Sequence, residues 1–191
     1  MRDQIIPALE AVLGKLTTQE EEFTNTGVRH KRLSDGTVEV DQDEYIMALK
    51  PITHNKLIGA APESDADEAL VPLYWSLLGA LAYSLLTQFW LAVYVVSLQR
   101  NTKKPLVIHI RRLNAVVRVA QKRPAKIIYI AMIPTGTLEC HADSGFSREQ
   151  DKGYGIRGLN MMRQGKAKAT KETVWHLLDS QCRSHKHVTR C

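Results

Sequence analysis

Near the C-terminus, two cysteines and two histidines are spaced closely enough to suggest a metal site. They are Cys182, His185, His187 and Cys191, and thiolates and imidazoles at short spacings are the ligands that zinc uses in proteins. Their order matches no zinc-knuckle pattern. We therefore expect a basic tail here without zinc, and metal analysis of the purified protein separates the two interpretations.

A glycine-rich string at residues 153–158 (GYGIRG) matches the pattern G-x-G-x-x-G. That pattern binds dinucleotides when it follows a strand and opens a helix, because the helix N-terminus then faces the pyrophosphate. The flanking residues here show no clear strand-to-helix context. We interpret the string as part of a strand and a turn.

The charges are distributed unevenly along the 191 residues. Residues 1–68 contain 14 acidic and 7 basic residues, whereas residues 69–139 contain nine basic residues and a single acidic one, Glu139. The formal net charge is +6. A basic region behind an acidic one suggests a polyanion as partner of the basic region, and a solvated basic face is the alternative.

Within that basic region, residues 106–122 predict an amphipathic helix. The apolar residues recur at helical spacing, and the basic residues lie largely off that stripe: Arg111, Arg112, Arg118 and Lys122. Such a face can contact phosphates, although many basic faces are only solvated. His109 is expected to be a partly buried residue of this helix.

A β-hairpin is predicted over residues 27–40, because Asp35-Gly36 is a tight-turn dipeptide between two extended runs. Its first strand carries Arg29 and Lys31, which could contact phosphates. The alternative is an edge strand that its charges keep soluble.

The remaining pattern indicates helices before residue 125 and strands after it. A short helix is expected over 4–16, with Pro7 near its start, and another over 42–50, capped by Asp41. The predicted strands are 126–133, 137–142, 153–163 and 173–179, with turns at 134–136 and 165–171.

No charged residue occurs from Ala69 to Gln99, a stretch long enough to span a bilayer. Polar residues interrupt it, so we predict two core helices, roughly 70–87 and 89–100, with a break near Thr87-Gln88. The alternative is a single-pass membrane protein through residues 70–98. Three cysteines and no signal-peptide-like stretch favour an intracellular location, in the cytoplasm or nucleus.

The order of these pieces resembles the Pol polyprotein of copia-type retrotransposons. The resemblance covers residues 20–190 and depends on the order of five features. They are the hairpin, the DQDEYI string at 41–46, the LGALAY string at 78–83, the basic helix with its Arg-Arg-Leu pattern, and the HADSGF string at 141–146.

This resemblance implies an α+β fold in three parts. Residues 1–58 would be the end of the reverse transcriptase palm with a primer-grip-like hairpin, and residues 59–125 a helical, thumb-like or connection-like region. Residues 126–191 would form the first half of a ribonuclease H-like domain, an incomplete antiparallel sheet.

The resemblance also implies that Asp143, at the end of a strand, is the first catalytic carboxylate and Mg²⁺ ligand of a ribonuclease H site. Two-metal hydrolysis needs several such carboxylates, and a turn-capping Asp143 beside Ser144-Gly145 is the alternative. The parent family therefore uses Mg²⁺, but we expect none to bind tightly here.

The departures from the family concern both active sites. Gln88-Phe89-Trp90 stands where the family has Arg-Pro-Asp, nothing before residue 27 matches the polymerase aspartates, and the later ribonuclease H carboxylates are missing. We therefore expect a Pol fragment that binds RNA–DNA hybrid or duplex nucleic acid, and possibly other parts of Pol, without nuclease activity of its own. An inert product of a degenerate element is the other alternative.

Overall fold

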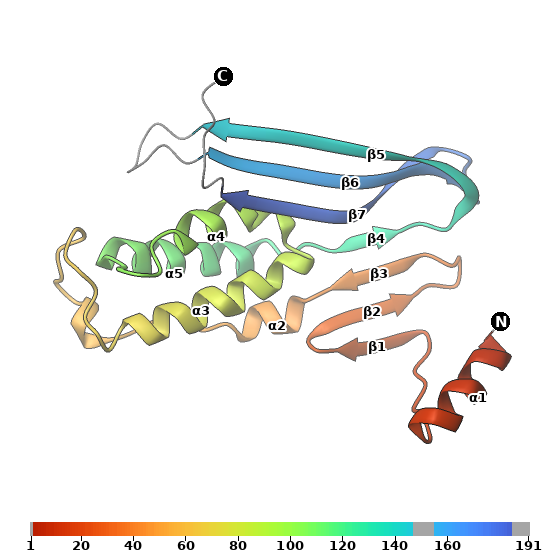
Figure 1. The fold of residues 1–191 in the computed structure, drawn as a ribbon, viewed down its shortest axis with the longest axis horizontal. Helices are drawn as coiled ribbons and strands as arrows, with labels where there is room; N and C mark the ends of the chain where they lie inside the picture. The colour runs from red at the N-terminus through yellow and green to blue at the C-terminus, as the bar shows by residue number, and fades with distance from the viewer. Residues whose placement is uncertain (1, 147–154, 185–191) are drawn as a thin grey trace.

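The computed structural model describes residues 2–146 and 155–184. It is a mixed α+β structure with two antiparallel sheets and a group of helices (Figure 1). The predicted α+β class is therefore confirmed.

The first sheet contains the predicted hairpin. Its strands are β1 (Glu22–Asn25), β2 (Val28–Arg32), β3 (Val38–Asp41) and β4 (Ile127–Tyr129), all antiparallel and in that spatial order. Gly36 has φ 83° in the turn between β2 and β3, a left-handed conformation that glycine adopts without steric cost. The Asp-Gly prediction of this hairpin is confirmed.

The fourth strand of this sheet differs from the prediction. The sequence predicts one buried strand over residues 126–133, but β4 covers only Ile127–Tyr129, β5 begins at Met132, and Ile128 is 49% exposed. The chain leaves β4 at Ile130 and enters the other sheet at Met132. The apolar run is thus divided between two sheets, which its composition could not show.

The helical part follows the hairpin along the chain. Its elements are α2 (Asp43–Ala48), η1 (Asn55–Leu57), α3 (Val71–Tyr83), η2 (Ser84–Leu86), η3 (Phe89–Leu91), α4 (Ala92–Gln99) and α5 (Val107–Lys122). Gln42, and not Asp41, occupies the N-cap position of α2, although the Asp41 carboxylate accepts a hydrogen bond from the Asp43 N–H at 3.3 Å.

Helices α3, α4 and α5 pack together around the main core. The most deeply buried side chains come from these three helices, from α2, from η3 and from the residue before α3: Ile46, Leu70, Tyr74, Leu81, Leu91, Val95, Ile110, Leu113 and Val117. The buried Tyr74 hydroxyl donates a hydrogen bond to the Leu98 carbonyl at 2.8 Å, and burial raises the pKa of Tyr74 to about 12.

The uncharged stretch forms two helices with a break, as predicted. Residues 84–91 form two short 3-10 turns between α3 and α4, with Ser84, Thr87 and Gln88 buried. The single span proposed as an alternative over residues 70–98 is not formed. Within the described part of the chain, no helix is both long and apolar enough to cross a membrane.

The second sheet consists of three long strands, β5 (Met132–Phe146), β6 (Gly155–Ala167) and β7 (Thr173–Ser184), in the order β5-β6-β7. The turn predicted at residues 134–136 is wrong, because these residues continue β5 through a register irregularity. Pro134 is tolerated because β5 is an edge strand, where a missing N–H costs no ladder hydrogen bond. Likewise, β6 runs on to Ala167, so the predicted turn at 165–171 begins later.

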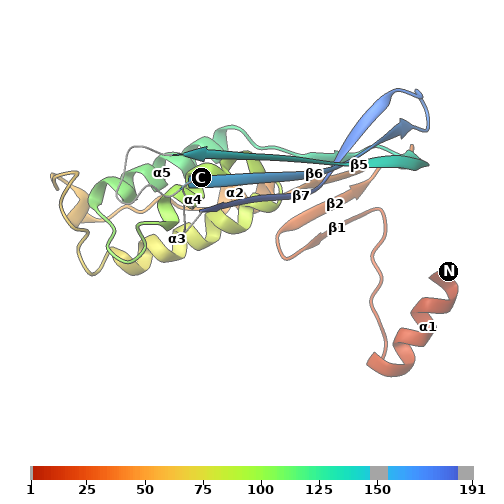
Figure 2. The same cartoon turned by 45° about the horizontal axis from the view of Figure 1, so that its top comes forward.

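The second sheet lies against the helices through its β7 edge (Figures 1 and 2). The Tyr129 hydroxyl on β4 donates to the Leu177 carbonyl on β7 at 3.0 Å, and the Lys168 N–H donates to the Ala131 carbonyl at 2.8 Å. The first bond connects the two sheets directly, and the second joins the linker between β4 and β5 to the turn after β6.

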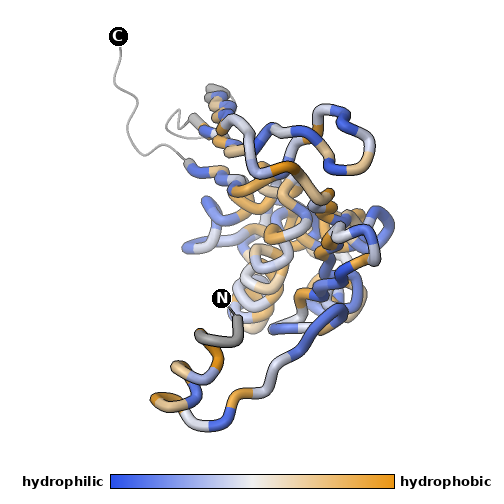
Figure 3. The backbone as a smooth tube through the Cα atoms, turned by 90° about the vertical axis from the view of Figure 1, so that its right-hand side faces the viewer, coloured by the Kyte–Doolittle hydropathy of each residue, from blue (hydrophilic) through white to orange (hydrophobic). Residues whose placement is uncertain are grey.

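The first helix, α1 (Arg2–Leu13), stands apart from the rest of the fold (Figures 1 and 3). It begins two residues earlier than predicted, so Pro7 lies inside it. Its apolar residues are poorly covered, with Val12 82% and Leu13 68% exposed. The helix ends at Leu13, and the next residue, Gly14, has φ 81°.

Candidate nucleic-acid interface

The amphipathic helix α5 is held to the core by the side-chain amides of a buried asparagine and a half-buried glutamine. The Asn114 amide accepts from the Ile52 N–H at 2.7 Å and donates to the Ile52 carbonyl at 2.9 Å. Gln121 donates to the Leu49 carbonyl at 2.7 Å. These bonds satisfy the backbone of the segment after α2, which forms no helix. They also fix which face of α5 is turned outward.

The outward face of α5 carries five exposed cations, which we call the α5 strip: Arg111, Arg112, Arg118, Lys122 and Arg123. No acidic residue occurs in α5. Among the described residues, no carboxylate forms an ion pair with any of the five. The predicted basic face is therefore present. The sequence pattern does not include Arg123, because it lies one residue beyond the predicted end of the helix.

The two ends of the α5 strip differ in their hydrogen bonds to the rest of the protein. The Arg111 guanidinium donates to the carbonyls of Leu57 and Ala60, at 3.2 and 2.8 Å, and so fastens the loop before α3. Arg118 and Lys122 form no side-chain hydrogen bond within the described residues. Arg111 is thus partly structural, whereas Arg118 and Lys122 are available to a partner.

His109, on the inner side of α5, closes the first turn of the helix. Its Nδ1 accepts a hydrogen bond from the Leu106 N–H at 3.0 Å. Burial lowers the pKa of His109, the positive charge of Arg112 lowers it further, and Glu63 opposes both. The ring is therefore neutral near pH 7 and serves the helix, consistent with the predicted structural role, although it is more buried than expected.

The hairpin cations are arranged differently, because carboxylates of neighbouring strands lie beside them. Arg29 on β2 contacts Asp41 on β3 with its Nη2 at 2.7 Å and Glu22 on β1 with its Nη1 at 3.2 Å. Lys31 lies 3.5 Å from Glu22. The two cations predicted to contact phosphates are thus already paired within the sheet.

The pKa and the burial of Asp41 show that its ion pair with Arg29 is part of the hairpin sheet. Burial acts to raise the pKa of this carboxyl, but the hydrogen bonds from Arg29 and the Asp43 N–H, together with the Arg29 charge, hold it below its usual value. Its side chain is only 3% exposed. The ion pair therefore belongs to the structure of the sheet.

Asp143 lies on the first strand of the three-stranded sheet, but not at its end. It pairs with Gly158 on β6, and β5 continues to Phe146. Alternation along the strand places Glu139 and His141 on the same face of β5, and His141 Nε2 lies 3.4 Å from Glu139 Oε2. The expectation of a strand-terminal Asp143 is corrected, because the ladder with β6 extends past it.

The described residues around Asp143 form no cluster of metal ligands. Over residues 2–146 and 155–184, no three His, Cys, Asp or Glu side chains are grouped so that they could hold a metal ion. Two Mg²⁺ ions need several oxygen ligands from the protein. The described part of the chain supplies no such cluster.

Two other sequence motifs fall partly outside the described residues. Cys182 lies on β7, where burial raises its pKa against the opposing charge of Arg100; the other three members of the Cys/His cluster lie in 185–191, outside the described residues. In the glycine string, residues 155–158 belong to β6, which agrees with a strand, whereas residues 153 and 154 are not described.

Comparison of the chain with protein-family models, with curated proteins and with solved structures gives no match. The retrotransposon resemblance seen in the sequence therefore stays a prediction.

Proposed function

We propose that the chain binds duplex nucleic acid or RNA–DNA hybrid through the phosphate backbone, and that the α5 strip is the contact surface. The observation that carries this proposal is a row of five exposed cations, none of which forms an ion pair with a carboxylate of the described residues. From residue 111 to 122, the helix extends for about 17 Å at 1.5 Å per residue. Duplex DNA carries about ten phosphate charges over that length.

The parent protein that we propose is a copia-type Pol polyprotein, of which this chain is a fragment. The order of elements supports this assignment: a hairpin sheet, then packed helices with a basic face, then an antiparallel sheet with Asp143 on its first strand. In such a parent, RNA-templated DNA synthesis and hybrid cleavage would belong to the complete protein. The fragment would keep only the binding of nucleic acid.

Binding is tested with a labelled RNA–DNA hybrid of about 20 base pairs, titrated with protein on filters. We expect Arg118→Ala/Lys122→Ala to weaken binding about tenfold, because two phosphates are no longer neutralised. The matched control is Lys15→Ala/Lys168→Ala, which removes two exposed lysines from other elements and is expected to change binding less than twofold. Equal effects of the two pairs would refute a defined α5 surface.

Nuclease activity is tested separately, with the same hybrid and added Mg²⁺. We expect no cleavage by this chain, because one carboxylate cannot hold two metal ions. Cleavage that is abolished by Asp143→Asn would contradict this part of the proposal.

A further inference from the structure

A shallow hollow of about 390 Å³ lies between α3 and the end of α4, beside an exposed tryptophan. It is lined by Trp75, Leu78, Gly79, Gln99, Thr102 and Lys103. A Cβ atom added at Gly79 would meet nothing within 4 Å, so the hollow is open at this point. None of these residues belongs to the α5 strip.

The indole of Trp75 is held in place although it is 52% exposed. Its Nε1–H donates a hydrogen bond to the Thr102 carbonyl at 2.8 Å, which joins α3 to the loop after α4. Because this bond fixes the ring, little side-chain entropy remains to be lost when a flat ligand stacks on it. An aromatic ring fixed at the surface is the platform on which unpaired bases stack.

One cation lines this hollow, and the segment that forms it contains no acidic residue. Residues 69–138, which include α3, α4 and the loop between α4 and α5, lack Asp and Glu entirely. Lys103 lines the hollow itself. Lys104, in contrast, is paired with Asp65 at 2.7 Å. Of these two lysines in the loop, Lys103 is therefore the one available to a ligand.

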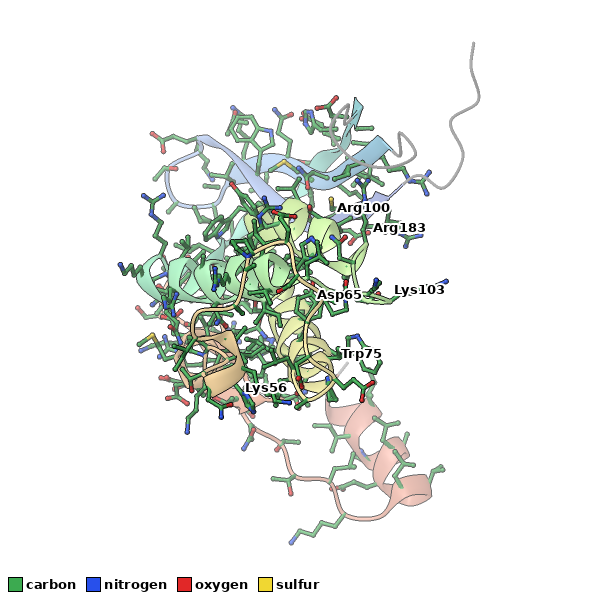
Figure 4. All side chains as sticks on the ribbon, turned by 90° about the vertical axis from the view of Figure 1, so that its left-hand side faces the viewer. Lys56, Asp65, Trp75, Arg100, Lys103 and Arg183 are labelled. Carbon is green, nitrogen blue, oxygen red and sulfur yellow. The ribbon has the colours of Figure 1, made fainter. Side chains whose placement is uncertain are left out.

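Other cations lie near the end of β7. Arg100 lies close enough to Cys182 on β7 to affect the pKa of its thiol, whereas Arg183, the next residue, belongs to the opposite face of the strand. Arg183 in turn lies opposite Arg157 in the ladder between β6 and β7. Figure 4 shows Trp75, Lys103, Arg100 and Arg183 on the same side of the molecule.

From this arrangement we infer a second nucleic-acid site, which takes an unpaired strand: one base stacks on Trp75, and a neighbouring phosphate contacts Lys103. The inference rests on the proposed nucleic-acid function and adds a substrate class to it, namely a single strand next to a duplex. An aromatic ring on which a base can stack and a cation that can contact the backbone are features of single-strand binding sites, and Trp75 and Lys103 supply them here.

The test uses oligo(dT) of about 12 nucleotides, with binding followed by anisotropy of a labelled strand. We expect Trp75→Leu to weaken binding about tenfold, the usual effect of losing one stacked base. The matched control is Trp175→Leu, since Trp175 on β7 is similarly exposed at 47% and should change binding less than twofold. Equal affinities of wild type and Trp75→Leu would overturn the inference.

A second variant, Lys103→Glu, tests the same site in case Trp75→Leu weakens binding only because it folds poorly. Lys103 is exposed on a loop, so its replacement should leave the melting temperature unchanged and still weaken oligo(dT) binding severalfold. Unchanged binding by Lys103→Glu would likewise overturn the site.

The failure of this inference can be told apart from failure of the proposed function. If the α5 variants lose hybrid binding but Trp75→Leu binds oligo(dT) as tightly as wild type, the single-strand site alone is overturned. Trp75-dependent binding of vesicles containing anionic lipid, without an effect on oligo(dT), would also overturn it. Wild-type protein that binds neither hybrid nor oligo(dT) would overturn both.

Discussion

The hairpin and helix α5 each present basic residues, yet only the helix leaves them available. Arg29 lies between the carboxylates of Glu22 and Asp41, because β2 has an acidic strand on either side of it. Arg118 and Lys122 form no ion pair among the described residues, and α3, α4 and α5 come from a stretch without acidic residues. The partner across the fold, and not the residue type, decides whether a cation can bind a phosphate.

The largest effect is expected when the charge of the helix surface is reversed. We predict that Arg112→Glu/Arg118→Glu/Lys122→Glu weakens binding of the RNA–DNA hybrid about a hundredfold or more at about 0.1 M salt, because three attractive interactions become repulsive. Filter binding measures this effect. The melting temperature should change little, since all three side chains are exposed. Undiminished binding would mean that nucleic acid contacts some other surface.

Next in size is the loss of the hairpin ion pair. Arg29→Ala should lower the free energy of unfolding by about 2 kcal/mol, because the buried carboxylate of Asp41 loses its partner and the pair is only partly exposed. Urea denaturation measures the change. Arg32→Ala on the same strand is the matched control, because Arg32 is exposed and forms no ion pair in the described residues. If both variants are equally stable, the pair is not structural.

A smaller effect is expected from Arg111, which lies in the α5 strip and also holds the loop before α3. Arg111→Ala should cost about 1 kcal/mol of stability, since two backbone carbonyls lose their donor. Arg118→Ala should stay within about 0.5 kcal/mol of wild type. Thermal melting of the two variants compares them. A larger loss for Arg118→Ala would contradict the division of roles along the α5 strip.

The smallest effect concerns the pH dependence of stability. Burial and the charge of Arg112 lower the pKa of His109. Because the pKa of His109 is lower in the folded than in the unfolded protein, its contribution is complete above about pH 6.5 and is lost as pH falls from there through the folded pKa. His109→Gln should flatten the dependence of stability on pH between about pH 7 and 5. Part of that dependence should remain, because burial also lowers the pKa of His176. An unchanged pH profile would show that His109 is not the responsible group.

Local patterns predict the helices and the hairpin well. The α5 periodicity, the Asp35-Gly36 turn and the break at Thr87-Gln88 each depend on residues near one another in sequence, and the structure confirms all three. The basic face of α5 can be predicted for the same reason. A helix brings together residues three and four positions apart, without help from distant segments.

The features that local patterns do not predict depend on contacts between segments distant in sequence. The partner of Arg29 is 12 residues away across a strand pair, and no pattern within β2 indicates it. The sequence predicts a turn at Pro134, where the structure has a strand, because proline and glycine usually end strands. Gly136 instead permits a close approach, since a Cβ there would collide with the Gln164 carbonyl oxygen on β6.

The most direct test of the central claim is the salt dependence of hybrid binding. The logarithm of the binding constant should fall linearly with the logarithm of salt concentration, and Arg118→Ala/Lys122→Ala should make that slope shallower by about two, one for each phosphate that the variant no longer neutralises. Lys31→Ala should leave the slope as in wild type, because Glu22 already neutralises Lys31. A slope that stays the same in the α5 double variant, or that changes in Lys31→Ala, would contradict the account.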